Sequence, residues 1–169
     1  MKKTVILFQG DSITDGGRLK DPNRAWDLNH QMGHCYAYNI ASFLGARYPE
    51  RNYEFINRGI SGNRVADLYG RWKEDALGFR PDILRFELWN SVIQPLQEKV
   101  MCLAERNGAV FVPLQDKFNE LCKVREPEYW VWDGIHPTVA GHQVIADQWM
   151  TCAKDIIECA YQKGDVDCG

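Results

Sequence analysis

The chain has 169 residues, of which 45% are hydrophobic and 25% are charged, and its net charge is −3. This length and composition predict one globular domain, residues 1–169, that buries roughly 70% of the surface of its unfolded form. The near balance of acidic and basic residues gives no sign of the basic surface that nucleic acids or anionic membranes require. We therefore expect a small-molecule substrate as the partner, while the oligomeric state stays open.

The N-terminus and the cysteines both indicate the cytoplasm. Lys2 and Lys3 are followed by an apolar run over residues 4–8 only. A signal peptide needs about 7–15 apolar residues and a membrane helix about 20, so we expect neither. The six cysteines are scattered without a Cys-x-x-Cys pair, which predicts reduced and mostly buried thiols.

The first predicted element is a buried strand that runs into a turn with one hydroxyl nucleophile. Residues 4–8 form the strand, and residues 9–17 (QGDSITDGG) form the turn. Ser12 stands between glycines that let the backbone bend sharply. Parallel sheets bind ligands at the carboxyl ends of their strands, so Ser12 is a candidate nucleophile. The alternative is that Ser12 only caps the following helix.

Strands and helices alternate along the rest of the chain. The predicted elements are a helix over 34–48, a strand over 53–57, a helix over 64–79, a strand from residue 82, a helical stretch over 86–106, a strand over 109–113, a helix over 114–122 and a helix over 138–162. This alternation predicts a three-layer α/β/α sandwich with a parallel sheet. In the turn over 57–63, Gly59 and Gly62 permit backbone N–H groups to point into a site.

A second chemical motif lies near the C-terminus, in the segment over 130–138 (WVWDGIHPT). Asp133 and His136 are three residues apart with a glycine between them. That spacing lets the carboxylate bind Nδ1 of the imidazole and leaves Nε2 to act as a base toward Ser12. A surface loop with an unrelated Asp and His is the alternative, and the N-terminal serine turn makes it the weaker one.

Three blocks of the chain resemble the GDSL, or SGNH, family of esterases and acylhydrolases. They are residues 8–15 (FQGDSITD), 57–63 (NRGISGN) and 133–137 (DGIHP), in the order of the family. The resemblance implies a flavodoxin-like SGNH-hydrolase fold. It also implies acyl-ester hydrolysis that needs no cofactor and no metal.

The resemblance also implies roles for particular residues. Ser12 is the expected nucleophile, and Asp133 and His136 complete the triad. The backbone N–H groups of Ser12 and Gly62 are the expected oxyanion donors. For substrate contacts we expect Asp11 and Asn63, which lie within the first two blocks, and Trp132, which precedes the third.

The substrate is expected to be a small acyl ester, most of all an acetyl group on a carbohydrate. The polar loop after Ser12 and the absence of an apolar lid in the sequence favour it over lipids. Thioesters and lysophospholipids, which other members of the family take, stay open as alternatives. So does a catalytically impaired, non-enzymatic remnant of the family.

The chain departs from the family after Leu84. Family members continue the third strand into a Gly-x-Asn-Asp turn, whose Asn is the third oxyanion donor, whereas this chain continues with Arg85 and a helical pattern. We predict a junction near Leu84–Arg85 at which a central segment is lacking. Either the chain is truly shortened or the recorded sequence omits a segment. We favour the omission, because removing a central strand leaves unpaired backbone. Asn90 lies in the helical stretch and is a poor substitute for the missing donor.

Overall fold

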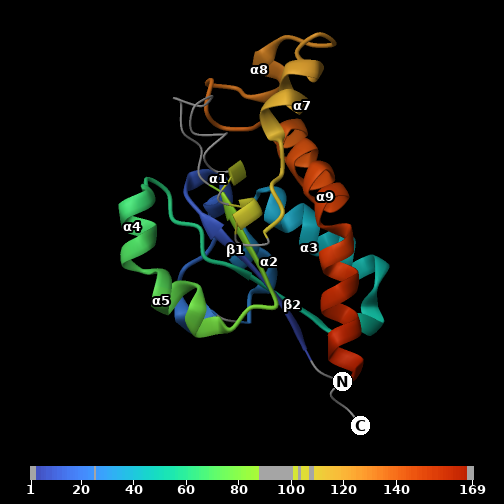
Figure 1. Cartoon of the computed structure of the whole chain (residues 1–169). Coiled ribbons are helices and arrows are strands. Elements are labelled where there is room, and N and C mark those ends of the chain that lie inside the picture. Colours follow the sequence, from blue (N-terminus) through green and yellow to red (C-terminus); the bar gives the residue numbers. More distant parts are fainter. Residues whose placement is uncertain (1–2, 25, 88–100, 103, 107–108, 167–169) are drawn as a thin grey trace. The chain divides into compact units, whose positions relative to one another are not determined.

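The structure is a computed structural model. It describes residues 3–24, 26–87, 101–102, 104–106 and 109–166, and Figure 1 shows the arrangement of its elements. The chain forms two compact units, residues 1–88 with 155–169, and residues 89–154. Within the described part of the chain, no helix is long and apolar enough to cross a membrane.

A parallel three-stranded sheet forms the centre of the first unit. Its strands are β1 (Thr4–Gly10), β2 (Tyr53–Asn57) and β3 (Ile83–Glu87), in the order β2-β1-β3. Both neighbours of β1 run parallel to it, and Phe8 pairs with Asn57 on one side and with Arg85 on the other. The near-continuous apolar run of β1 is typical of a strand that is buried on both faces.

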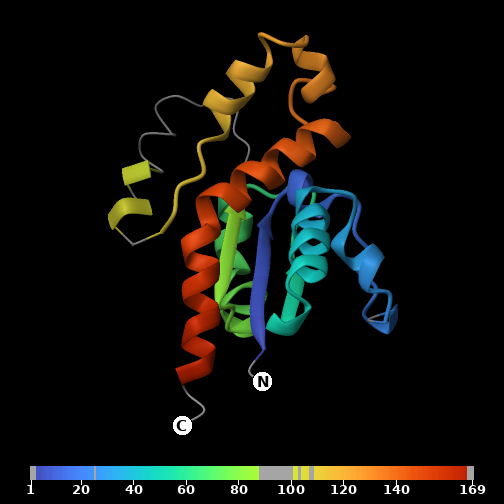
Figure 2. The ribbon, with the colours of Figure 1, turned by 90° about the vertical axis from the view of Figure 1, so that its right-hand side faces the viewer.

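Helices cover both faces of this sheet. The short helices of the first unit are α1 (Ser12–Asp15), η1 (Pro22–Arg24), α2 (Leu28–Met32), η2 (Pro49–Arg51), α4 (Val65–Gly70), α5 (Trp72–Asp75) and η3 (Leu77–Phe79). The longer helix α3 (Tyr36–Arg47) and the C-terminal part of α9 (Val139–Val166) lie on one face, and α4 and α5 lie on the other (Figures 1 and 2). This confirms the three-layer α/β/α prediction.

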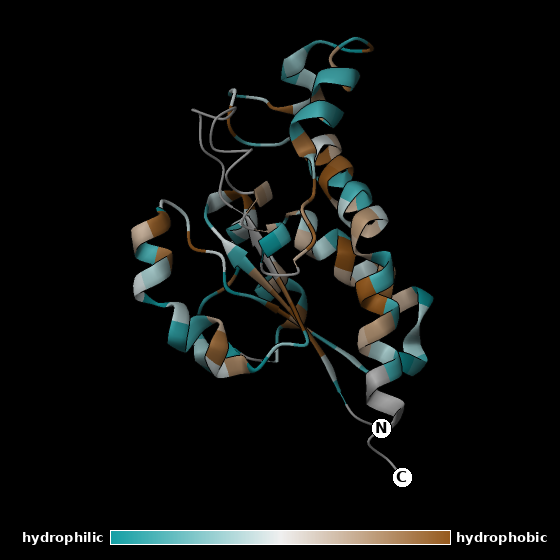
Figure 3. Ribbon diagram, in the orientation of Figure 1, coloured by the Kyte–Doolittle hydropathy of each residue, from teal (hydrophilic) through white to brown (hydrophobic). Residues whose placement is uncertain are grey.

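The core of the first unit comes from β1 and the helices around it. Ile6, Leu7 and Phe8 are fully buried, as are Ile40 and Leu44 of α3. Figure 3 shows brown, hydrophobic stretches along the strands in the middle of the sheet. A strand covered on both sides by apolar helix faces gives Ser12 a rigid support.

The second unit is mainly helical. Residues 101–102 and 104–106 are helical, and α7 (Leu114–Leu121) and α8 (Pro127–Trp130) follow them. A single antiparallel bridge joins Val131 to Pro137. The long helix α9 (Val139–Val166) begins directly after it. Thr138 caps α9, because its Oγ1 accepts from the N–H of Gly141 at 3.2 Å.

Six of the predicted elements are confirmed, namely those over 4–8, 34–48, 53–57, from 82, over 114–122 and over 138–162, which are β1, α3, β2, β3, α7 and α9. The single helix over 64–79 is wrong. The chain forms α4, α5 and η3 there, and Arg71 leaves the helical region with φ −106° and ψ 9°. Val65, expected on the apolar stripe, is 58% exposed. The break lets the Arg71 side chain bond to the turn over 57–63, and the weak helix propensity of Gly70 favours the same break.

The region after Leu84 also differs from prediction. Residues 85–87 continue β3 instead of starting a helix, since they pair with β1 as far as Gly10. Residues 109–113, predicted as a buried strand, form no strand and are partly or fully exposed. A strand needs a partner for its N–H and C=O groups, and no described strand pairs with this segment.

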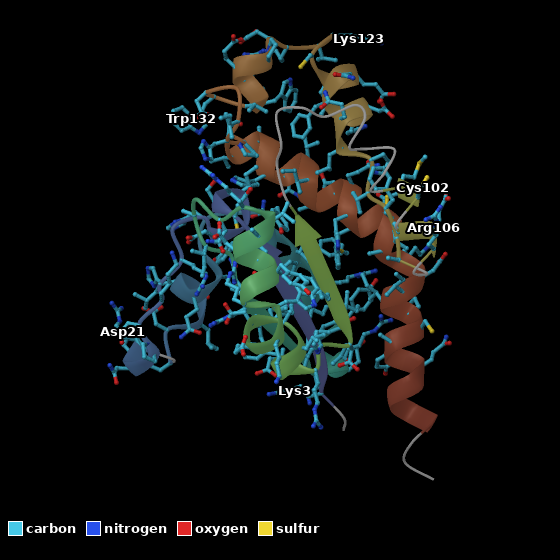
Figure 4. All side chains as sticks on the ribbon, turned by 60° about the vertical axis from the view of Figure 1, so that its left-hand side comes forward. Lys3, Asp21, Cys102, Arg106, Lys123 and Trp132 are labelled. Atoms are coloured by element: carbon cyan, nitrogen blue, oxygen red, sulfur yellow. The ribbon has the colours of Figure 1, made fainter. Side chains whose placement is uncertain are left out.

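The thiols are less buried than predicted. Cys35 is buried, whereas Cys102, Cys122 and Cys159 are exposed, and all of them are free thiols. Figure 4 labels Cys102 on the outer side of its helical segment. Cys168 lies outside the described residues. A thiol on a helix that is only partly covered faces solvent on the uncovered side, so helical patterning alone did not predict its burial.

Candidate active site

The turn between β1 and α1 carries the candidate nucleophile. Since β1 is the central strand and ends at Gly10, Ser12 stands at the carboxyl edge of the sheet. Asp11, not Ser12, caps α1, because its Oδ1 accepts from the N–H of Ile13 at 3.0 Å. The capping alternative for Ser12 is therefore wrong. Gly16 ends this single helical turn with φ 53°, a conformation that favours glycine.

The turn over 57–63 lies directly beside the end of β1. The N–H of Ile60 donates to the carbonyl of Gly10 at 3.1 Å, and the N–H of Arg58 donates to the carbonyl of Phe8 at 2.8 Å. The two bonds extend the pairing of β1 and β2 beyond the sheet. They bring the second family-like block to the same edge as the serine turn.

The side chain of Asn57 fixes this second turn on α1. Its Nδ2 donates to the carbonyls of Thr14 at 2.7 Å and Met32 at 2.8 Å, while its Oδ1 accepts from the N–H of Gly59 at 2.9 Å. Asn57 is only 5% exposed, so these bonds are shielded from water. Gly62, two residues further on, has φ 81° and an open space where a side chain would be. Its backbone N–H belongs to an exposed turn at the edge of the site.

Arg71 supports the same turn from α5. Its Nε donates to Oδ1 of Asn63 at 2.7 Å, and its Nη1 donates to the carbonyl of Arg58 at 2.9 Å and to Asp75 at 2.8 Å. Arg58 also pairs with Asp75. Burial raises the pKa of Asp75, but the hydrogen bonds from Arg58 and Arg71 outweigh it and hold the pKa below its ordinary value. The carboxylate therefore stays ionised between two guanidinium groups.

The roles of Arg71 and Asp75 were missed from the sequence. The only signal is their opposite charge at a spacing of four residues, which commonly means a solvent-exposed helical pair. Nothing in that spacing indicates that the arginine reaches back to Asn63. The predicted substrate role of Asn63 stays a prediction, and its side-chain oxygen already accepts from Arg71.

A second cluster is the loop between α8 and α9, which brings Asp133 and His136 together. Nδ1 of His136 lies 2.7 Å from Oδ2 of Asp133. Oδ1 of the same carboxylate accepts from the N–H groups of His136 at 2.7 Å and Ile135 at 3.0 Å. These hydrogen bonds, first the one from the backbone of His136 and then the one from its ring, lower the pKa of Asp133 to about 2. Gly134 makes the tight loop possible with φ 82°.

The loop is held against the start of α9. The N–H of Thr138 donates to the carbonyl of Trp130 at 2.9 Å, and its Oγ1 donates to the carbonyl of Tyr129 at 2.8 Å. A Cβ on Gly141 would lie 2.1 Å from the carbonyl oxygen of Trp130, so only glycine allows this approach. The loop that carries the Asp–His pair is thus packed on a long helix.

Trp132 lies beside the imidazole. Its ring stacks on that of His136 with centroids 6.0 Å apart and an interplanar angle of 23°, and the side chain is 62% exposed. Figure 4 labels it on the loop before α9. An exposed indole next to a candidate catalytic base fits the predicted substrate contact, which stays a prediction.

The predicted site residues fall in two groups. Ser12, Gly62 and Asn63 belong to the first unit, with Asp11, and the structure brings their turns together at one edge of the sheet. Asp133, His136 and Trp132 belong to the second unit and are brought together in one loop. The meeting of Ser12 with His136 stays a prediction. Asn90 lies outside the described residues.

Two histidines lie near the end of α2. His30 and His34 are four residues apart, a spacing that places side chains on one face of a helix, but α2 ends at Met32 and the chain turns at Gly33 with φ 70°. His30 instead bonds through Nδ1 to Oδ1 of Asp27 at 2.6 Å. The described residues contain no group of three His, Cys, Asp or Glu side chains that could hold a metal ion.

Comparison with known proteins agrees with this arrangement. The model of the family described as GDSL-like lipase/acylhydrolase matches residues 85–149. An acetylxylan esterase from Geobacillus stearothermophilus is 29% identical over 198 residues, which cover 83% of this chain and 90% of the relative. A solved GDSL-like lipase from Parabacteroides merdae is 27% identical with a TM-score of 0.80, covering 89% of this chain and 95% of its own. The solved acetylxylan esterase Axe2 of G. stearothermophilus has 25% identity and a TM-score of 0.72.

These relatives also bear on the predicted junction. The alignment with the esterase extends over 198 residues, more than the 169 of this chain, so the relative contains residues that this chain lacks. Three catalytic mutants of Axe2 change a serine at position 15, an aspartate at 191 and a histidine at 194. Here Ser12, Asp133 and His136 have the same Asp-to-His spacing, while the stretch between Ser and Asp is shorter by more than fifty residues. The family model begins to match at residue 85, beside the predicted junction.

The sequence motifs, the fold and the Asp-to-His spacing therefore all support the same family. The match of the family model, the esterase relative and the solved structures agree with the three-layer fold. The comparisons support the GDSL, or SGNH, family of lipases and acylhydrolases for this chain, and with it the activity of a carboxylic ester hydrolase.

Proposed function

We propose that this protein is a serine esterase that removes small acyl groups, above all acetyl, from carbohydrates. Ser12 is the nucleophile, His136 the general base and Asp133 the carboxylate that orients it. The observation that carries the proposal is the 2.7 Å contact between Oδ2 of Asp133 and Nδ1 of His136. With Nδ1 donating to the carboxylate, the proton-accepting atom of the neutral ring is Nε2.

The reaction has two steps. In the first, Nε2 of His136 takes the proton of Ser12, whose Oγ attacks the ester carbonyl, and the imidazolium then gives that proton to the leaving alcohol. In the second, His136 takes a proton from water, which attacks the carbonyl of the acyl-enzyme. The imidazolium then gives that proton to Oγ of Ser12 as the bond to the acyl group breaks and the acid leaves. Asp133 stays ionised throughout, since its pKa is about 2, and stabilises the imidazolium in both steps.

The backbone N–H groups of Ser12 and Gly62 are the proposed oxyanion donors. Support comes from their common edge of the sheet, where the Gly62 turn is bonded to Gly10 and α1. The family's third donor, an Asn side chain, belongs to the stretch in which this chain is shorter than its relative. If the chain is truly shortened, the loss of this one donor costs about 10²–10³ in rate, and we then expect a slow but measurable enzyme.

The acetyl-carbohydrate substrate is supported by the relative described as an acetylxylan esterase. The exposed Trp132 supports it too, since a flat indole can contact a sugar ring. Asp11, in the turn between β1 and α1, and Asn63, in the turn over 57–63, stay proposed substrate contacts. The impaired remnant is the second candidate function, and the shorter stretch between Ser12 and Asp133 is the observation that favours it.

The test compares the wild-type protein with Ser12→Ala. With p-nitrophenyl acetate, the variant should lose a factor on the order of 10⁴–10⁶ in kcat. Labelling with a fluorophosphonate should modify Ser12 in the wild type, and an unlabelled, inactive wild type would establish the remnant instead. Acetylated xylooligosaccharide should be hydrolysed faster than a lysophospholipid or a thioester, and the reverse order would overturn the substrate class.

A further inference from the structure

Asp15 connects the two turns of the first unit. It is the last residue of α1, three residues after Ser12, and is only 1% exposed. Its Oδ2 accepts from the backbone N–H of Ser61 at 2.8 Å and from the Ser61 hydroxyl at 3.0 Å. Its Oδ1 accepts from the N–H of Arg18 at 3.2 Å, and Nζ of Lys20 lies 2.5 Å from Oδ2. A buried carboxylate with four donors is held in one position.

The packing around Asp15 leaves the two turns little freedom. A Cβ on Gly59 would lie 2.3 Å from the backbone nitrogen of Asp15 and 2.6 Å from the carbonyl carbon of Thr14. The guanidinium of Arg18 donates through Nε to the carbonyl of Gly59 at 2.9 Å. The backbone of the second turn therefore rests on α1, and the carboxylate bonds it at Ser61.

The turn that Asp15 holds is one in which a peptide can flip. The N–H of Asn63 donates to the carbonyl of Ile60 at 3.2 Å, and Gly62 has φ 81°, which is the pattern of a type II turn. Type I and type II turns differ by a flip of their central peptide, here the one between Ser61 and Gly62. The direction of the Gly62 N–H is therefore the variable that changes between the two forms.

We propose that Asp15 is a positioning residue that holds this turn in the form that directs the Gly62 N–H to the oxyanion. The proposal rests on the proposed function, in which Gly62 is an oxyanion donor. Asp15 acts on Ser61, the residue before Gly62, and touches no reacting atom. Lys20 and the nearby guanidinium of Arg18 offset the negative charge of the carboxylate, which would otherwise oppose a developing oxyanion.

The carboxylate keeps its charge over the range of an activity assay. Burial raises the pKa of Asp15, but the hydrogen bonds from Lys20 and Ser61 outweigh it and leave the pKa below the ordinary value. Removing the charge by mutation should therefore lower activity at every pH by the same factor. A shift of the pH profile is not expected.

The test uses Asp15→Asn, with Asp27→Asn as the matched control. Asparagine has one oxygen where Asp15 uses two, so either Ser61 or Arg18 faces an amide nitrogen. We expect kcat, per fluorophosphonate-titrated active site, to fall by about 10–10³, up to the size of one oxyanion donor, with KM within threefold. Asp27 is also buried and caps α2, but it bonds only within its own loop, so its variant should keep kcat within threefold.

Ser61→Ala provides a second, milder variant. It removes one of the two bonds from Ser61 to Asp15 without touching the core, and we expect kcat to fall by about threefold to tenfold. If Asp15→Asn does not fold, an unchanged kcat in Ser61→Ala overturns the proposal. If Asp15→Asn folds and keeps its kcat, the proposal is also overturned. Retained activity in Ser12→Ala would instead overturn the proposed function, so the two failures are distinct.

Discussion

Replacing Asp133 by asparagine changes one carboxylate oxygen into an amide nitrogen, and the structure determines which one. Oδ1 accepts from two backbone N–H groups, those of Ile135 at 3.0 Å and His136 at 2.7 Å. Only an oxygen can accept both bonds. The amide oxygen of the variant should therefore take the place of Oδ1, and the NH₂ group should face Nδ1 of His136.

That orientation imposes the wrong tautomer on the imidazole. An NH₂ group donates, so Nδ1 must accept, and the single proton of the neutral ring moves to Nε2. A protonated Nε2 cannot take the proton of Ser12. The loop keeps its backbone bonds, so the loss is chemical and not structural, and we expect kcat to fall about 10⁴-fold with KM little changed.

The assay is steady-state hydrolysis of p-nitrophenyl acetate at neutral pH, with thermal unfolding measured in parallel. Asp27→Asn is the control, because Asp27 and His30 form an Asp–His pair with the same spacing and a 2.6 Å contact. It should keep kcat within threefold, since His30 has no proposed role. If Asp133→Asn kept more than a tenth of the wild-type kcat, the tautomer argument would be refuted.

Three further changes test the stability of the fold. Burial, and to a smaller extent the nearby His136, lowers the pKa of His142 to about 4. Below about pH 6.5 the unfolded chain therefore binds a proton at His142 that the folded chain does not bind, which favours unfolding. The Tm of the wild type should fall between pH 6.5 and 4, and the Tm of His142→Gln should fall less. Arg51 bonds Glu158 through both carboxylate oxygens at 3.0 Å, and Arg51→Ala should lower Tm by several degrees with kcat unchanged. Gly59→Ala should have a much lower Tm than the wild type, because the added Cβ would lie 2.3 Å from the backbone nitrogen of Asp15 in α1. Gly70→Ala should keep its Tm, because no atom lies within 4 Å of the Cβ added there.

Each of these has an outcome that contradicts it. A His142→Gln variant with the wild-type loss of Tm on acidification would mean that other groups cause the decline. An unchanged Tm in Arg51→Ala would mean that its pair with Glu158, on an arginine side chain only 10% exposed, contributes no more than a surface pair. Equal Tm values for the two glycine variants would show that the backbone can move away from α1.

Local patterns predicted the parts of the site that depend on neighbours in the sequence. The serine turn follows from an apolar strand and flanking glycines, and the contact between Asp133 and His136 spans only three residues. Asp15 could not be found in this way. Its partner Ser61 is 46 residues away, and an Asp after a GDS motif has the same local pattern whether or not it bonds a distant turn.

The errors also come from distant contacts. Residues 109–113 have the composition of a strand, but a strand forms only where a neighbour can pair with it, and no described strand does so. The predicted helix over 64–79 breaks at Arg71, whose side chain bonds Asn63 and Arg58 instead of following the helical surface. Propensity is a weak guide where such tertiary bonds compete with it.

The proposed roles of Asp133 and Asp15 differ, and this affects how variants combine. In the proposed mechanism, Asp133 acts on the proton transfer through His136, whereas Asp15 acts on the charge of the oxyanion through Gly62. Stabilisation of the oxyanion persists when the triad is damaged, because it does not need the base. Asp15→Asn should therefore still reduce the residual rate of Asp133→Asn. Two substitutions within the triad itself, such as those at Ser12 and Asp133, should together lower kcat little more than the more damaging substitution does alone.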